Sequence, residues 1–149
     1  MVLSKVIGNP VYDALEAYCQ DHDIEYGFAS EPESGAELIE DFVNRKKEGT
    51  WSITIFDDFT STNTYSRSDP YNKLQNLTYS MLRNFQNHAI CLTQSYTNVS
   101  PLCRTNCNLL ILFRMKNQAS IDRAAQDFEN IANDFNQEDF YGIYQNVLK

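Results

Sequence analysis

Short apolar runs alternate with amphipathic segments along most of this chain. The clearest runs span Trp51–Phe56, 89–93 and Leu109–Phe113, and each is short and rich in aliphatic or aromatic side chains. Such runs are typical of buried β-strands. Weaker runs at Val2–Ile7 and Ile24–Phe28 predict two further short strands.

The segments between these runs carry apolar residues at helical spacing. Asn9-Pro10 and Asp69-Pro70 have the form of an N-cap followed by a first helical residue. The predicted helices span 10–21, 36–47 and 70–85, a segment opening at Ser120, and 139–148. Strands and helices that alternate in this way predict a single α/β domain, with a parallel sheet covered by helices on both faces.

Two adjacent carboxylates follow the first of the strong runs. Asp57 and Asp58 come at the end of a predicted buried strand, where an unpaired charge is costly. Ligands of α/β proteins bind at the carboxyl ends of strands, and an acid there is the usual Mg²⁺ ligand of a P-loop NTPase. The sequence therefore predicts Asp57 as a metal ligand. The alternative is a plain strand that ends in a polar turn.

A glutamine and an arginine complete a possible site for phosphoryl transfer. Gln94 ends the second run, and Arg104 lies on the loop that leads to the third. In this interpretation the acids hold metal and polarise water, Gln94 orients phosphate or water, and Arg104 stabilises the charge of the transition state. The alternatives are a strand-end amide that bonds backbone and a surface arginine paired with an acid.

Three motifs in this order resemble a known family. They are Asn87-His-Ala-Ile-Cys-Leu-Thr-Gln-Ser-Tyr96, Val99-Ser-Pro-Leu-Cys-Arg-Thr-Asn106 and Leu109-Leu-Ile-Leu-Phe-Arg114. Together with the Asp-Asp strand they resemble the poxvirus-type DNA-packaging ATPases. That family belongs to the FtsK/HerA group of P-loop NTPases and occurs in large DNA viruses, virophages and related elements. The resemblance covers roughly Trp51 to Phe113 and weakens toward both ends of the chain.

The resemblance implies a RecA-like three-layer sandwich that uses ATP and Mg²⁺. It assigns Asp57 to the metal, Asp58 to water activation, Gln94 to sensing the γ-phosphate or water, and Arg104 to a neighbouring subunit's nucleotide, with Arg114 as a weaker candidate. It further implies a homo-oligomeric ring that translocates double-stranded DNA through its pore, works with capsid or packaging proteins, and resides in the virion or host cytoplasm, in a viral factory. Family order places strand 51–56 beside 89–93, and the phosphate-loop strand between 89–93 and 109–113.

The phosphate cradle itself is missing from these residues. None of the five glycines is followed by lysine, so the pattern Gly-x-x-x-x-Gly-Lys-Ser/Thr is absent. We therefore expect residues 1–149 to form a partial P-loop NTPase domain that lacks the phosphate-loop strand and does not hydrolyse ATP alone. In this interpretation Met1–Asn9 is similar to the family's second strand, and the chain is a fragment or a split or degenerate gene product. The alternative is a non-catalytic interaction module with the same fold.

Charge and cysteine content narrow the functional classes. A net charge of −8 and a pI of about 4.6 argue against a bulk electrostatic grip on DNA, although a ring motor needs only a few pore residues. No secretion signal or membrane span is evident, so we expect a protein that is not secreted and whose four cysteines stay reduced. Cys103, Cys107 and His88 form at most a partial zinc set, and packed thiols are the favoured interpretation.

Overall fold

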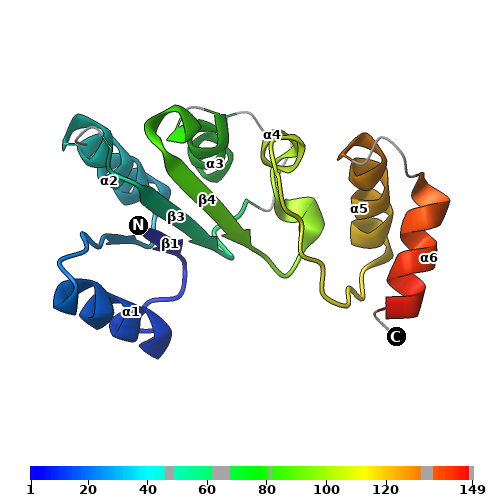
Figure 1. Ribbon diagram of the computed structural model, residues 1–149, viewed down its shortest axis with the longest axis horizontal. Coiled ribbons are helices and arrows are strands. Elements are labelled where there is room, and N and C mark those ends of the chain that lie inside the picture. The colour runs from blue at the N-terminus through cyan, green and yellow to red at the C-terminus, as the bar shows by residue number, and fades with distance from the viewer. Residues whose placement is uncertain (46–48, 62–67, 81, 132–135, 148–149) are drawn as a thin grey trace.

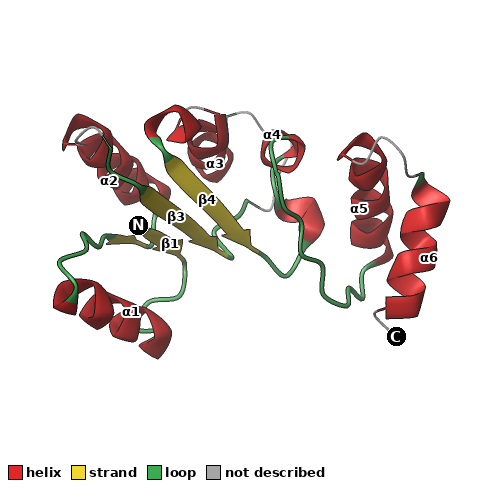
Figure 2. Cartoon of the chain, in the orientation of Figure 1, coloured by secondary structure: helices red, strands yellow, loops and turns green. Residues whose placement is uncertain are grey.

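The chain folds around a four-stranded sheet whose strands are all parallel. The computed structural model describes residues 1–45, 49–61, 68–80, 82–131 and 136–147. The strands are β1 (Val2–Ser4), β2 (Phe28–Ala29), β3 (Ser52–Asp57) and β4 (Asn87–Leu92), in the order β2-β1-β3-β4. The fold is thus α/β, with helices between the strands (Figures 1 and 2).

The longest ladder joins β3 to β4. It pairs six residues in parallel register, from Ser52 with Asn87 to Asp57 with Leu92. β1 pairs with the other side of β3, where Val2 faces Ile55 and Ser4 faces Asp57. The carboxyl ends of β1, β3 and β4 therefore meet at one edge of the sheet, as the sequence predicts for β3 and β4.

Helices connect the strands and continue beyond them. The α-helices are α1 (Pro10–Asp21), α2 (Pro32–Arg45), α3 (Pro70–Ser80), α4 (Pro101–Thr105), α5 (Gln118–Ile131) and α6 (Gln137–Val147), and the 3₁₀ helices are η1 (Leu82–Phe85) and η2 (Tyr96–Asn98). The Asn9 side chain accepts the Val11 N–H at the start of α1, which is the cap that the sequence predicts. Among the described residues, no helix is both long and apolar enough to cross a membrane.

Helices lie on both faces of the sheet, which confirms the predicted layering. α1 lies below the sheet in Figure 1, and its Tyr12 reaches the end of β3. α2 and α3 lie on the opposite face (Figure 1). Gly35 permits the close approach of α2, because a Cβ there would come within 2.8 Å of Leu74 and 2.9 Å of Leu3.

The main core lies between the sheet and the α2–α3 layer. Its buried side chains are Leu3, Ala29, Ile39, Phe56, Phe59, Leu74 and Leu82. Phe56 is fully buried on β3 and packs near the Phe59 and Tyr79 rings. This cluster holds β1 and β3 against the helices and fixes where β3 ends.

A second core lies at the C-terminal side of the molecule. Tyr96, Ala124, Ala125 and Phe140 are buried there, and the partly buried Leu110 and Leu112 pack against them. In Figure 1, α5 and α6 lie side by side at the far end from α1, on the other side of α4. The described residues thus form two cores, one between the sheet and the α2–α3 layer and one between the last helices.

The predicted strand at 109–113 is wrong. The structure assigns no strand to Leu109–Phe113, and the sheet ends at β4 among the described residues. Leu110 and Leu112 pack into the second core, while Leu109, Ile111 and Phe113 remain exposed. The apolar run is therefore buried on one side by α5 and α6 instead of by a neighbouring strand.

Other boundaries differ from the predictions by shorter stretches. The first strand ends at Ser4, and the second is limited to Phe28–Ala29. The helix expected to reach residue 85 ends at Ser80, and Leu82–Phe85 is a 3₁₀ helix. The last two helices begin two residues before their predicted starts, at Gln118 and Gln137. Most of the polar stretch after Thr60 falls outside the described residues.

Candidate functional site

The carboxyl edge of the sheet collects polar side chains from three strands. Lys5 follows β1, Asp57 ends β3 and Asp58 follows it, and Thr93 and Gln94 follow β4. They gather here because parallel strands present their carboxyl ends on the same side. This edge is where the sequence predicts the metal and the water-activating residues.

Asp58 and Gln94 form a direct pair. The Gln94 backbone N–H donates to Asp58 Oδ1 at 3.1 Å, and the Gln94 side-chain amide donates to Asp58 Oδ2 at 2.6 Å. The Asp58 N–H in turn donates to the Leu92 carbonyl at 2.9 Å. The predicted juxtaposition of Asp58 and Gln94 is therefore confirmed. Gln94 bonds the Asp58 carboxylate through both its backbone N–H and its side-chain amide.

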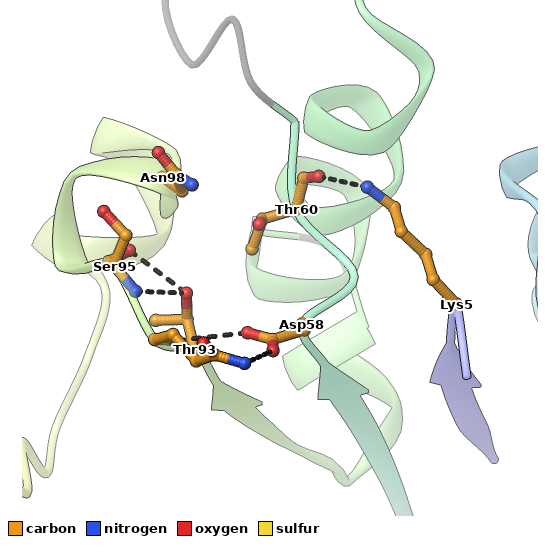
Figure 3. Close-up of a pocket in the computed structure, with 7 residues that line it drawn as sticks. Lys5, Asp58, Thr60, Thr93, Ser95 and Asn98 are labelled. Atoms are coloured by element: carbon orange, nitrogen blue, oxygen red, sulfur yellow. Dashed lines mark hydrogen bonds between the residues drawn. The ribbon is translucent and has the colours of Figure 1, made fainter.

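Asp58 adopts a backbone conformation that aims its carboxylate across the strand ends. Its φ is +47°, in the left-handed region that Asp, Asn and Gly tolerate best. β3 therefore ends abruptly at Asp57, and the next residue turns toward β4. The turn brings the Asp58 carboxylate to the end of β4, as Figure 3 shows.

Asp57 lies at the same edge, but its side chain points to the α1 face. The Tyr12 hydroxyl donates a short hydrogen bond to Asp57 Oδ2, and the Ser4 hydroxyl donates to the same atom at 3.3 Å. Burial raises the pKa of Tyr12 to about 12, and the bond to Asp57 adds to that rise. Two hydroxyl groups therefore bond one oxygen of the carboxylate that the sequence assigns to a metal.

A small polar cavity lies beside Asp58 and Gln94, and Asp57 does not line it. It has a volume of about 260 Å³ and is lined by Lys5, Asp58, Thr60, Thr93, Gln94, Ser95 and Asn98 (Figure 3). Pockets that enclose drug-sized ligands have volumes of about 300–1,000 Å³. The cavity is of a size for a phosphate group or a hydrated cation and is small for a whole nucleotide.

Lys5 is the cationic group of this cavity. Its ammonium donates to the Thr60 carbonyl at 2.7 Å and lies 4.2 Å from the centre of the Tyr71 ring. Figure 3 shows the Lys5 side chain reaching across to the segment that follows Asp58. The cavity thus has a positive group on the β1 side and the Asp58 carboxylate in its lining, a pairing suited to a small charged ligand.

Arg104 does not lie at this edge as a free cation. Its side chain is 4% exposed, and its Nε donates to Asp127 Oδ2 at 2.6 Å. Its Nη1 donates a short bond to the Val99 carbonyl, and the Tyr96 ring lies 5.5 Å away. The alternative of an arginine paired with an acid is confirmed, but the pair is buried and not at the surface.

Asp127 is the centre of this buried network. The Tyr96 hydroxyl donates to Asp127 Oδ2 at 3.1 Å, and Arg123 Nε forms an ion pair with Oδ1 at 3.4 Å. Burial, followed by the Asp127 charge, raises the pKa of Tyr96 well above its ordinary value. The network joins the loop after Gln94 to α4 and α5, so it positions one wall of the cavity.

Two of the cysteines are packed thiols. Among the described residues, no three His, Cys, Asp or Glu side chains are grouped as ligands. Cys103 is buried, and the Ser100 hydroxyl donates to its sulfur at 3.0 Å. Burial raises the pKa of Cys103 to about 11 and that of Cys91 to about 12. Both are packed thiols, as the sequence interpretation favours.

Several residues of this region were not expected from the sequence. Tyr12, Ser4 and Lys5 come from the amino-terminal elements, far from the recognised motifs. Only a correct pairing of β1 with β3 could have found them. Asp127 carried a weak signal, since it is an acid three residues after the buried Ala124 on the same helical face.

Comparison with protein-family models, with curated proteins and with solved structures found no match for this chain.

Proposed function

We propose that this chain is part of a viral genome-packaging ATPase, a P-loop NTPase unit that couples ATP hydrolysis to DNA translocation. The observation that carries the proposal is the Asp58–Gln94 pair at the carboxyl edge of adjacent parallel strands. A water-activating acid and a phosphate-sensing amide need this proximity. In this proposal the fold is RecA-like.

The strand order supports the same proposal. The resemblance requires strand 51–56 beside strand 89–93, and β3 pairs with β4 along six residues. It also requires a phosphate-loop strand on the far side of β4, and β4 is the edge of the sheet among the described residues. The phosphate cradle would then come from outside these 149 residues and pair with that edge.

The donor atoms at the edge suit Mg²⁺. Two places at the edge offer the hard oxygen ligands that Mg²⁺ prefers: Asp57 and Ser4 on the α1 side, and Asp58 and Thr60 at the cavity. Asp57 is the residue that would hold the ion, and bound Mg²⁺ would neutralise charge on the phosphates of ATP. Tyr12 and Ser4 orient the Asp57 carboxylate, and Lys5 adds a positive group on the β1 side.

Asp58 and Gln94 have different roles in this proposal, one in activating water and one in sensing the phosphate. The two bonds from Gln94 fix the Asp58 carboxylate in one orientation, so that it can accept a proton from an attacking water. The same amide would report the state of the phosphate to Ser95 and η2, which follow it directly. Other copies in a ring, double-stranded DNA and capsid or packaging proteins are the partners in this proposal, and the virion or host cytoplasm is the location.

Paramagnetic Mn²⁺ provides the test of the metal site. We expect Mn²⁺ to broaden the amide resonances of Asp57, Asp58 and Gln94 first, because broadening falls steeply with distance from the ion. Asp57→Asn should abolish this selectivity, and Asp21→Asn, at an exposed position on α1, should leave it intact. Equal broadening at Asp21 and Asp57, or no effect of Asp57→Asn, would contradict a metal site here.

Hydrolysis gives a second readout. The purified chain should release phosphate from MgATP no faster than buffer, because no segment of its sequence can cradle the phosphates. Rapid Mg²⁺-dependent release that Asp58→Asn abolishes would show that the cradle is not required from elsewhere.

Two contacts favour a second candidate, a non-catalytic module with the same fold. Arg104 is buried against Asp127, and the Asp57 carboxylate is occupied by Tyr12 and Ser4. In such a module the polar edge fastens strands together and binds no ion. Asp57→Asn would then lower the midpoint of unfolding equally with and without Mg²⁺, whereas a metal site predicts stabilisation of the native protein alone by Mg²⁺.

A further inference from the structure

The outer edge of β4 is open. β3 pairs with one side of β4, and no strand among the described residues pairs with the other. Ile90 and Leu92 point to the face that α2 and α3 do not cover, and they are 43% and 50% exposed. A parallel sheet normally buries both faces, and an open apolar edge is a template for another strand.

The chain also carries a strand-like segment that has no ladder. Burial alternates along Leu109–Phe113, which is the period of a β-strand. Leu110 and Leu112 pack into the second core. Leu109, Ile111 and Phe113 are 74%, 68% and 80% exposed. Three large apolar side chains on one side of five residues form a surface that a soluble monomer rarely exposes.

Charges at the ends of these two elements are complementary. Arg114 directly follows the segment, and Lys116 comes two residues later. Both are exposed, and neither takes part in an ion pair among the described residues. Asp57 and Asp58 lie at the carboxyl end of the β3–β4 ladder. If the segment ran parallel to β4, its end would bring Arg114 to the acidic edge. An antiparallel arrangement would bring Arg114 to the other end, near Ser52 and Asn87, which have no charge.

We propose that Leu109–Phe113 of one copy adds to the open edge of β4 in a second copy as a parallel strand, and places Arg114 beside that copy's Asp58. The occupant is a second copy because each chain carries one donor segment and one acceptor edge of matching length. Leu110 and Leu112 hold the segment against α5 and α6, so the donated strand would bring its own helical cover.

This contact joins two different surfaces, so its closure depends on the rotation between copies. A two-fold exchange closes as a dimer, and a smaller rotation closes as a ring. In either case the partner contributes a positive residue to the polar edge described above. The inference needs neither ATP nor metal. A phosphate-loop strand, where one is present, would occupy the same edge of β4, so the inference concerns this chain without that strand. Failure of its test would leave the proposed function standing.

Molecular mass in solution, measured by light scattering over a dilution series, tests the proposal. The native chain should exceed its monomer mass of 17.2 kDa and dissociate on dilution. Ile111→Asp disables the donor segment and Ile90→Asp disables the acceptor edge, so each variant alone should be monomeric. Ile24→Asp is the matched control, since Ile24 is 51% exposed elsewhere, and it should associate as the native chain does.

Mixing the Ile90→Asp and Ile111→Asp variants gives the most decisive experiment. The Ile90→Asp copy still has an intact segment, and the Ile111→Asp copy still has an intact edge, so the mixture should form a complex with one copy of each. A monomeric native chain at every concentration would overturn the proposal. So would association that survives both substitutions, or a mixture that stays monomeric while circular dichroism shows both variants folded.

Charge reversal tests the orientation of the added strand. Arg114→Glu should weaken association about fivefold, because it replaces an attractive contact with Asp58 by a repulsive one. Lys73→Glu, on the exposed side of α3, changes the net charge by the same amount and should have a smaller effect. Equal effects of the two substitutions would overturn the parallel arrangement.

Discussion

Two apolar runs of similar length differ in whether they join the sheet. β4 pairs with β3 along six residues and buries Asn87, Ala89 and Cys91 wholly or partly on one face. Leu109–Phe113 is the more apolar of the two, yet it has no strand partner and exposes three of its five side chains. Apolar content alone therefore does not decide which run joins the sheet.

The difference comes from what each run finds nearby. α3 and η1 return the chain to the β3 edge, so β4 meets an open ladder as soon as it begins. Leu109–Phe113 follows α4 and meets the aromatic side chains of α5 and α6 first. A short apolar segment is stabilised by burial, and it packs against whichever apolar surface its connecting loop allows it to contact. The predictions below test how far this contrast extends.

The largest contrast concerns one phenylalanine from each region. Phe56→Ala should destabilise the protein by about 3–5 kcal/mol, because Phe56 is fully buried between the sheet and α3. Phe113→Ala should change stability by less than about 0.5 kcal/mol in dilute solution, because Phe113 is 80% exposed. Urea unfolding of both variants measures the difference. Similar losses would show that Phe113 is buried in solution.

The buried ion pair should come next in size. Arg104→Met removes the main partner of Asp127 and should cost about 3 kcal/mol, because the carboxylate stays buried with only Tyr96 and the more distant Arg123. Arg104→Met combined with Asp127→Leu should recover most of that loss. Thermal unfolding of the single and double variants provides the check. An Arg104→Met protein of native stability would mean that the guanidinium is solvent-exposed, as a residue acting on a neighbouring subunit requires.

A smaller effect separates neighbouring residues within the second run. Leu112→Ala should cost roughly 1 kcal/mol, since Leu112 is only partly buried against α5 and α6. Ile111→Ala should be close to neutral, because that side chain is 68% exposed. Denaturant unfolding at low protein concentration keeps association from contributing. The opposite order of the two losses would mean that the segment presents its other face to the helices.

The last expected effect depends on pH. The pKa of Cys91 in β4 is raised to about 12 by burial, and an unfolded thiol ionises near its ordinary value of about 9. The unfolded chain therefore loses a proton first as pH rises, so this contribution is complete below about pH 9 and declines toward pH 12. Cys91→Ala should flatten the loss of stability between about pH 9 and about pH 12. Leu92→Ala, at an exposed position in the same strand and with no titratable group, is the comparison and should leave the slope unchanged.

Much of the sheet was accessible to sequence analysis. The apolar periods of β3 and β4 and the proline-marked starts of α1 and α3 are local signals, and they predict parallel strands with helices on both faces. The contact between Asp58 and Gln94 follows from the same reasoning, because it needs only that two neighbouring strands end together. These features depend on nearby residues or on simple topology.

What the sequence did not predict depends on contacts between distant segments. The burial of Arg104 requires Asp127, which is 23 positions away on a helix that the motifs do not include. The occupation of Asp57 requires Tyr12, which is 45 positions away on α1. The failure to place Leu109–Phe113 has the same cause, since its partner was decided by α5 and α6. No local pattern reports such pairings.

The left-handed backbone of Asp58 has a consequence for how this position can vary. Few side chains accept a φ of +47°, and asparagine is the one that also keeps the shape of the carboxylate. One base change converts an aspartate codon into an asparagine codon, so the charge can be removed without disturbing the turn. A library covering every substitution at Asp58 should therefore retain asparagine and glycine when selected for folding alone. Loss of asparagine under selection for activity would show that activity requires the negative charge of the Asp58 carboxylate.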